Sequence, residues 1–471
     1  MGAGGAGGGF GGGQFGQGGF GGVSGGGQGG GGIGGGIGGG GISGGVAGGI
    51  MIDSHGVVTP IFSRRRSTVL ENQRRIAHSQ KVLGQDLFRP SKMRKVSLVR
   101  LEKACEEYAK NKTHVPLDIQ FMAGLQRIDY VFVYPEKKDV VIAGPAEGFA
   151  ENEIGRIVGI TSGRPPIRLD DLVVALRSIR KGKGLIGCSI DQNETRRANM
   201  ARFQRQNRGA ASVRVVQWRY RRMAEILGMQ KVTVWGVPED SHFAQTLVEA
   251  DYRMKRLAIG LEPAQVKGFR SHLDMNLRGN SQQRWWFAPF YDEFEMNDDE
   301  TAFHFAGQRV QLLANDELVN AKGKRKDAAT TRLTTAKYAK HFTAKFPALA
   351  NQKPIFADLQ TLFDVSVFAA LLKKHSIPEK IGWGMKLFLD EGRANLIAGN
   401  VPRQVHSLVN YRMKGRRSVI GMISGGVMID PELTVRQLKY KTSPRNQLGE
   451  LQKESQRSLQ DDKIDKNWWW D

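Results

Sequence analysis

Apolar residues recur at helical spacing in several parts of this chain. The clearest stripe joins Phe243, Leu247, Ala250, Met254 and Leu257 at intervals of 4, 3, 4 and 3 residues, so these side chains share one face of a helix. We expect this helix to pack on a sheet, because a one-sided apolar stripe has to be buried. The same reasoning, with Ser97 and Asp170 as N-caps, predicts helices at 98–111, 172–180, 194–207, 331–346 and 355–374.

Short runs of β-branched and aromatic residues predict the strands. Two of them, 128–134 and 140–143, are separated by a turn-forming composition and predict a hairpin. A second hairpin is predicted around Gly307 and Gln308. The predicted strands outside the first hairpin span 184–190, 213–218, 231–237, 301–306 and 309–313, with a short helix between 218 and 231. The fold class predicted is α/β or α+β, with a mixed sheet, packed helices and at least two subdomains.

Composition divides the chain of 471 residues into five parts. Residues 1–50 hold 32 of the 60 glycines, and the first charged residue is Asp53, which predicts a disordered tail that acts as a flexible linker or a sticky arm. The tail lacks the basic start and apolar stretch of a secretory signal. The predicted parts are the tail at 1–52, a basic arm at 53–95, an α/β domain at 96–265, an α+β region at 266–440 and a polar C-terminal tail at 441–471.

The formal net charge is +23, and the basic residues cluster in the segments 54–100, 164–222 and 322–345. Such clusters predict salt-sensitive attraction to polyanions, namely nucleic acid, acidic polysaccharide or an anionic envelope surface. A basic surface that only keeps the protein in solution explains the same charge. The candidate polyanion contacts are Arg196, Arg197, Arg202 and Arg205 on the helix predicted at 194–207. Base stacking also needs aromatic residues interleaved with the basic ones, and we do not predict it here.

A dense aromatic run lies at residues 284–292. Core packing between subdomains explains such a run, because aromatic side chains dominate buried area. The functional alternative is a stacking platform for a sugar ring or a base. Its residues are Arg284, Trp285, Trp286, Tyr291 and Asp292, with the first and last as polar handles.

The sequence contains no complete motif for nucleotide binding or metal binding. Gly182–Gly187 matches a dinucleotide fingerprint, but a predicted helix precedes it and a strand follows it, which is the reverse of the order that binding needs. None of the nine His lies three to five residues from another, so we predict no metal site and no cofactor. Cys105 and Cys188 are predicted as buried thiols. No window approaches the roughly 18 unbroken apolar residues of a membrane span, so none is predicted.

Six strings stand out together within residues 85–430. They are Val140–Gly148, Thr161–Pro165 with Leu169–Leu172, Cys188–Asp191, Leu247–Lys255, Arg284–Phe287 and Leu359–Asp364. In this combination the chain resembles the planctomycete family of uncharacterised proteins that carries domain of unknown function 1598. The resemblance implies no activity and no catalytic residue. Because members of that family often look exported, it implies an exported or envelope location if the true start lies upstream of Met1, and a cytoplasmic one otherwise.

We therefore expect an exported or envelope-associated binding or structural protein that performs no catalysis. A hydrolase or transferase whose site is assembled from distant residues is the first alternative. A protein that binds nucleic acid or other polyanions without sequence preference is the second. A cleft with convergent Asp, His and Arg favours the enzyme, whereas basic segments gathered on one face favour the polyanion binder.

Overall fold

The computed structural model describes residues 47–52, 58–63, 68–111, 113–182, 184–275, 281–319, 324–327, 331–393, 399, 401–414, 417–457 and 467–471. Of the tail predicted at 1–52, residues 1–46 lie outside the described residues. Its last six residues form strand β1 (Ala47–Ile52), which pairs antiparallel with β2 (Val58–Ser63).

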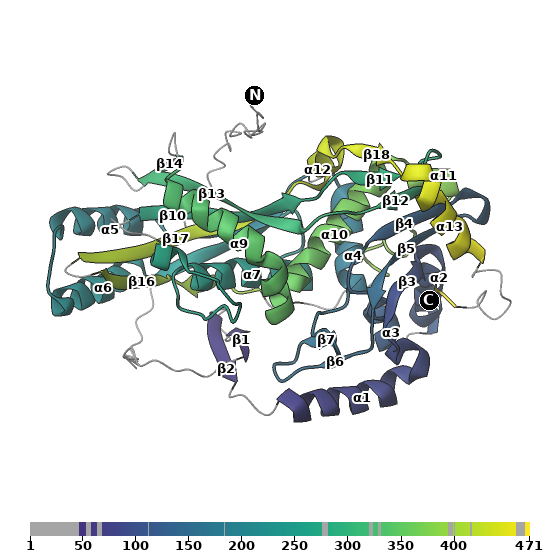
Figure 1. Ribbon diagram of the computed structural model, residues 1–471, viewed down its shortest axis with the longest axis horizontal. Helices are drawn as coiled ribbons and strands as arrows, with labels where there is room; N and C mark the ends of the chain where they lie inside the picture. Colours follow the sequence, from purple (N-terminus) through teal and green to yellow (C-terminus); the bar gives the residue numbers. More distant parts are fainter. Residues whose placement is uncertain are drawn as a thin grey trace. The chain divides into compact units, whose positions relative to one another are not determined.

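The larger of two mixed sheets contains eight strands among the described residues, in the order β14-β13-β10-β17-β8-β9-β15, with β16 also paired to β17 (Figure 1). Its neighbouring strands run antiparallel except for β10 and β17, which run parallel. The strands are β8 (Ile186–Asp191), β9 (Met229–Trp235), β10 (Ser281–Phe290), β13 (Arg309–Val319), β14 (Arg325–Asp327), β15 (Gln404–His406), β16 (Val409–Lys414) and β17 (Arg417–Ile429).

The second sheet has seven described strands in the order β18-β11-β12-β4-β5-β3-β19. Its hairpin of β4 and β5 is the one that the sequence predicted around residues 135–139. The strands are β3 (Ser91–Ser97), β4 (Tyr130–Tyr134), β5 (Asp139–Ala146), β11 (Phe294–Met296), β12 (Ala302–His304), β18 (Tyr440–Thr442) and β19 (Trp469–Trp470). A separate pair joins β6 (Phe149–Glu151) and β7 (Ile157–Gly159).

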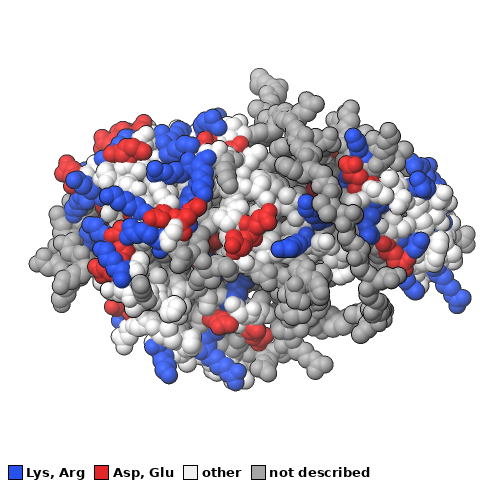
Figure 2. All heavy atoms as spheres, turned by 180° about the vertical axis from the view of Figure 1, so that it is seen from behind, with Lys and Arg blue, Asp and Glu red and all other residues white. Residues whose placement is uncertain are grey.

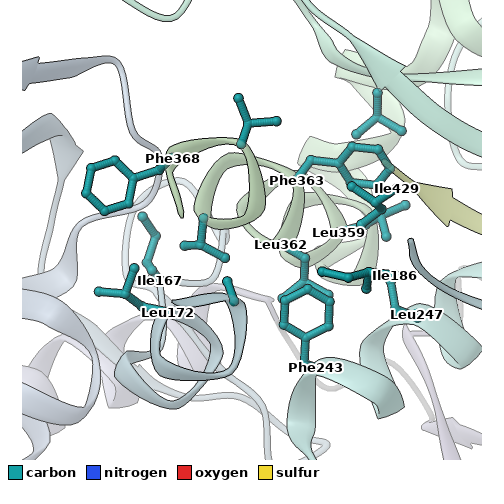
Figure 3. Close-up of a cluster of buried hydrophobic side chains, with 14 of the residues drawn as sticks. Ile167, Leu172, Ile186, Phe243, Leu247, Leu359, Leu362, Phe363, Phe368 and Ile429 are labelled. Carbon is teal, nitrogen blue, oxygen red and sulfur yellow. The ribbon is translucent and has the colours of Figure 1, made fainter. Parts of the chain in front are cut away.

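Four helices form the core beside the larger sheet: α4 (Leu169–Arg180), α7 (His242–Ala258), α9 (Leu333–Gln352) and α10 (Pro354–Lys374). α7 packs on β8 and β17, and α9 packs on β13. α10 contacts all three of the other helices, α4, α7 and α9. In Figure 3, Phe243 and Leu247 of α7 lie beside side chains of α10 and of both strands. Leu247 is fully buried, so the predicted stripe is a core element.

α10 is the one described helix that is long and apolar enough, by length and composition alone, to cross a membrane. Its most apolar window has a mean hydropathy of 1.7 and is completely buried inside the protein. That is the position of a core helix.

The remaining described helices surround these layers (Figure 1). They are α1 (Thr68–Phe88), α2 (Leu98–Asn111), α3 (Leu117–Gln120), α5 (Glu194–Gln206), α6 (Val213–Leu227), α8 (His272–Met275), α11 (Ile377–Ile381), α12 (Pro431–Gln437) and α13 (Gln447–Arg457), with three short 3₁₀ turns. Ser97 caps α2 as predicted, since its Oγ accepts a hydrogen bond from the N–H of Arg100 at 3.2 Å. The predicted cap Asp170 lies inside α4, whose N-cap is Arg168.

One predicted strand and one predicted hairpin are wrong. The segment 213–218 is the first half of helix α6, because Ser212 caps it and Val216, Met223 and Leu227 are buried at helical spacing. The hairpin around Gly307 does not form. At this point the chain crosses between sheets, so β12 pairs with β4 and β11, whereas β13 pairs with β10 and β14.

The segments predicted as a basic arm and a polar C-terminal tail contain regular structure. The basic arm contains β2, all of α1 and part of β3, and the C-terminal segment contains α13 and β19. β19 pairs with β3, and Arg94 donates hydrogen bonds to the carboxylate of Asp471 at 2.8 and 2.9 Å. In the larger sheet β8 and β9, from before position 265, lie between β17 and β15, from after it, and residues 45–471 form one compact unit.

Candidate functional site

Helices α5 and α6 pack against each other and lie at the left end of the described body in Figure 1. A short connection, residues 207–212, joins them. Together with β16 they bury a small apolar cluster, which includes Met200, Met223, Leu227 and Val409. The pair therefore has an inner apolar face, and its outer face is free to carry charge.

That outer face is rich in arginine. Residues 194–227 contain nine Arg, two Glu and no Lys. Seven of the guanidinium side chains are exposed: Arg196, Arg202, Arg205, Arg208, Arg214, Arg221 and Arg222. Arg222 lies 2.9 Å from Glu225, and the other six have no carboxylate partner within the described part of the chain. Unpaired exposed cations attract polyanions over a Debye length of about 8 Å at physiological salt.

A groove of about 480 Å³ lies between the two helices. Its described lining contains three arginines and no acidic side chain; the lining residues are Arg196, Asn199, Arg202, Phe203, Gln206, Arg222 and Ile226. Guanidinium groups bind phosphate or sulfate oxygens through paired N–H donors. The groove therefore suits an anionic group of that size.

The backbone at the end of α6 positions one of these arginines. Gly228 ends the helix with φ of +54°, a conformation that favours glycine. The guanidinium of Arg196 lies against it, where a Cβ atom would collide. A cation at a helix C-terminus is favourable, because the helix dipole is negative there.

An exposed indole completes the surface. Trp218 is 52 % exposed, and its ring lies 5.7 Å from that of Phe203 in a tilted arrangement. Arg214, Arg221 and Arg222 stand four residues before and three and four residues after it, so they share its face of α6. Aromatic side chains within a basic surface are typical of single-stranded nucleic-acid binding. Phe203, Trp218 and Tyr220 interleave with the arginines, so the composition that base stacking needs is present here.

Of the four predicted polyanion contacts, three are exposed and one is buried. Arg196, Arg202 and Arg205 are exposed on α5, and the first two line the groove. Arg197 is buried, and its guanidinium donates to the carbonyl of Gln192. Sequence reasoning missed the contribution of α6, because it read the first half of that helix as a buried strand.

The predicted stacking platform is divided between the two faces of β10, because neighbouring residues of a strand point in opposite directions. Trp285 is fully buried and packs against His272 and Tyr338, with ring centroids at 4.9 and 5.0 Å. Trp286 points the other way, toward Arg284 at 5.8 Å.

The other two members of that set follow β10. Tyr291 donates a hydrogen bond to Asp364 at 3.0 Å, and burial raises the pKa of its phenol. Asp292 is exposed. The five side chains therefore form no common surface.

Parts of the first and second basic segments lie apart. In Figure 1, α5 and α6 of the second segment lie at the left end of the described body, whereas α1 of the first segment lies along its lower right side. Figure 2 shows that acidic side chains are interspersed with Lys and Arg over the rear face. The α5–α6 surface is thus a local feature of one helical pair.

The remaining chemical candidates lie in packed or connecting regions. Cys105 and Cys188 are free and buried, and burial raises the pKa of the Cys105 thiol to about 12. The glycines at 182–187 connect helix α4 to strand β8, the order that argued against a dinucleotide site. The described residues contain no cluster of three or more His, Cys, Asp or Glu that could hold a metal ion.

Comparison with known proteins finds a family segment in this chain. The family model described as Protein of unknown function (DUF1598) matches residues 188–272. No curated protein and no solved structure matches the chain. The matched segment runs from β8 to α8 and includes all of α5, α6 and α7. The chain therefore contains a segment similar to this domain of unknown function, and the arginine-rich helical pair lies within it.

Proposed function

We propose that the protein binds a polyanion on the α5–α6 surface and that its preferred ligand is single-stranded nucleic acid. The observation that carries the proposal is the set of six exposed arginines without carboxylate partners around the groove and Trp218. In a structural surface we expect such charges to alternate with acidic residues, as they do on the rear face (Figure 2).

Each part of the surface has its own task in this binding. The guanidinium groups of Arg196, Arg202 and Arg222 hold backbone phosphates in the groove and release condensed counterions. The indole of Trp218 stacks on an unpaired base, which is worth about 1–3 kcal/mol per base and is tolerant of sequence. Neither contact reads a base edge, so the binding has no strong sequence preference.

Trp218 is what favours nucleic acid over an acidic polysaccharide. A sulfated polysaccharide satisfies the arginines equally well but gives the indole no base to stack on. In the exported or envelope setting that the family resemblance implies, acidic polysaccharide is the competing ligand. The two ligands therefore differ in how strongly they depend on Trp218.

The test is fluorescence anisotropy of a labelled oligothymidylate of about 20 nucleotides, long enough to exceed a typical site. We expect the triple variant R196Q/R202Q/R222Q to bind at least about 30-fold more weakly at low salt, because it loses three phosphate contacts. The matched control K92Q/K137Q/K380Q removes the same charge from exposed lysines elsewhere. Equal binding by the two triple variants would show that net charge alone attracts the ligand.

The ligand class is tested by W218A with heparin as competitor. We expect this variant to lose about tenfold in affinity for the oligonucleotide through the lost stacking. Its affinity for heparin should stay within a factor of about two, because sulfates contact only the cations. An equal loss for both ligands, or none for either, contradicts the assignment to nucleic acid.

A further inference from the structure

A second pocket, of about 320 Å³, lies where α7 and α10 meet the loop before α4 and the turn between β6 and β7. Much of its wall is apolar and comes from Phe121, Ile154, Ile157, Pro165 and Pro166. Its polar side chains come from segments far apart in the sequence and include His242, Arg168 and Arg156. Apolar walls with a few convergent polar groups are typical of small-molecule sites.

A histidine–carboxylate pair stands at the edge of this pocket. Nδ1 of His242, in the first turn of α7, lies 2.9 Å from Oδ2 of Asp171 in α4. Asp171 is 2 % exposed, and its other oxygen has no hydrogen-bond partner among the described residues. A buried carboxylate that accepts from Nδ1–H leaves Nε2 as the basic nitrogen, which is the arrangement of a general base.

The Nε2 side of the ring remains available to a ligand. Among the described residues its hydrogen-bonding neighbour is the hydroxyl of Thr246 at 3.5 Å, a long contact for a hydrogen bond. The His242 side chain keeps 19 % of its surface exposed and lines the pocket, whereas Thr246 is 1 % exposed and cannot meet a substrate. Water is therefore the nucleophile that this site could activate.

The other charged groups near His242 are held by one another. Arg156, from the β6–β7 turn, donates to Glu249 of α7 at 2.7 Å and also to Asp358 of α10. Both carboxylates therefore have Arg156 as a partner, and Glu249 also has Arg253 at 3.4 Å. This ion pair network fixes the positions of α7 and α10 around the pocket.

Arg168 lines the pocket, and its ion pair with a carboxylate is long. Its guanidinium is 3.6 Å from Asp170 and stands 5.3 Å above the ring of Phe121. Its Nε is buried and has no hydrogen-bond partner among the described residues. A buried unsatisfied donor costs about 1–3 kcal/mol, so a ligand group that accepts from this Nε would remove that cost.

We propose that this pocket hydrolyses a small, uncharged carboxylic ester, with His242 as general base and acid and Asp171 as the residue that positions it. The attacking water forms a bond from its oxygen to the carbonyl carbon and gives a proton to Nε2 of His242. Arg168 donates to the carbonyl oxygen as negative charge develops on it. The ester C–O bond then breaks, and the leaving alkoxide takes the proton back from Nε2, so that an acid, an alcohol and the resting enzyme remain.

The uncharged substrate follows from the pocket itself. The apolar wall covers hydrocarbon, and the carboxylates of Glu249 and Asp358 already have Arg156 as their partner. The volume is at the low end of the range for small-molecule sites, about 300–1,000 Å³, which limits the acyl group to a few carbons.

The test is hydrolysis of p-nitrophenyl acetate and butyrate by the full chain at mildly alkaline pH. We expect His242→Gln to lower kcat/KM by at least about 100-fold, which is the usual contribution of general base catalysis. Asp171→Asn should lower kcat by about tenfold or more with little change in KM, because it alters the imidazole and not the binding wall. Arg168→Gln should lower kcat to a similar degree.

Exposed histidines hydrolyse activated esters slowly, so the matched control is His406→Gln on the exposed edge of β15. This control should keep the full rate. A wild-type rate of ester hydrolysis no higher than that of H242Q would overturn the proposal.

Two further measurements on each variant separate a loss of hydrolysis from a loss of folding and from a loss of polyanion binding. Thermal melting of each variant shows whether a lost rate is a lost fold, and His242→Asn gives a second side chain at the same position. Oligonucleotide binding should be unchanged in H242Q, because His242 lies outside the groove between α5 and α6. Loss of ester hydrolysis with intact oligonucleotide binding separates this site from the α5–α6 surface.

Discussion

Helices α6 and α7 follow one another in the chain, carry several basic residues each, and use them in opposite ways. α7 buries 15 of its 17 residues, and Arg253, Lys255 and Arg256 each lie within 3.4 Å of a carboxylate oxygen. α6 buries three of its 15 residues, and its Arg214 and Arg221 face solvent with no carboxylate partner in the described part of the chain.

The comparison shows that a buried basic residue and an exposed one contribute differently to the stability of the fold. A buried cation that loses its partner costs about 3–5 kcal/mol, so the charges of α7 are tied to the fold. An exposed cation contributes within about 0.5 kcal/mol, so the fold gives no reason for the arginines of α6. Residues that the fold does not need and that converge on a groove are better explained by a ligand.

The largest difference between the two helices should appear when a carboxylate is placed on each. Leu247→Asp, in the core of α7, should cost at least about 3 kcal/mol and leave much of the protein unfolded, because it removes apolar burial and desolvates a charge. Val215→Asp, on the exposed face of α6, should shift stability by less than about 1 kcal/mol. Chemical denaturation measures both, and equal losses would contradict the comparison.

Breaking one ion pair of α7 should have the next largest effect. Lys255 donates to Asp251 at 2.8 Å, and both side chains are almost completely buried. Lys255→Met should destabilise the protein by about 3 kcal/mol, because it leaves a buried carboxylate without its cation. The counterpart Arg214→Met on α6 should be neutral in the same unfolding experiment.

A buried histidine predicts an acid-sensitive contribution to stability. His272 is 1 % exposed, and burial lowers its pKa to about 4, below the ordinary value near 6.5. Since the unfolded chain binds the proton more tightly, stability is lost as the pH falls from about 6.5 through about 4. His272→Phe keeps the ring and should flatten this part of a curve of stability against pH. His406→Gln, an exposed site, should leave the curve as it is in the wild type.

The smallest effect on stability should come from the arginines of the groove. R196Q/R202Q/R222Q should melt within about 2 °C of the wild type, because exposed and mostly unpaired charges add little to the fold. A markedly lower melting temperature would show that these arginines serve the packing of α5 on α6 and not a ligand.

These two helices also show what could be predicted from the sequence. The stripe of α7 is complete over four turns, so its period identified both the helix and its buried face. The start of α6 carries Val213, Val215, Val216 and Trp218, and their strand propensity led to the prediction of a strand there. Only three residues of α6 are buried, in a small cluster away from the main core.

The sites were less predictable than the fold. Counting arginines identified a basic helix, but only the packing of α5 on α6 brings Arg222 to Arg196 and Arg202 and buries Arg197. The contact of His242 with Asp171 joins residues 71 positions apart. No spacing rule along the chain links them, and Asp171 resembled an ordinary acidic residue at a helix start.

The salt dependence of oligonucleotide binding tests the central claim most directly. For the wild type, the logarithm of the association constant should fall linearly with the logarithm of the salt concentration between about 50 and 200 mM, since each phosphate contact releases counterions. R196Q/R202Q/R222Q should give a slope shallower by about 2, from three lost contacts at about 0.7 each on a single strand. The control K92Q/K137Q/K380Q should keep the wild-type slope. A slope that is the same in all three proteins, or an affinity that does not change with salt, would contradict the assignment of ligand binding to the α5–α6 surface.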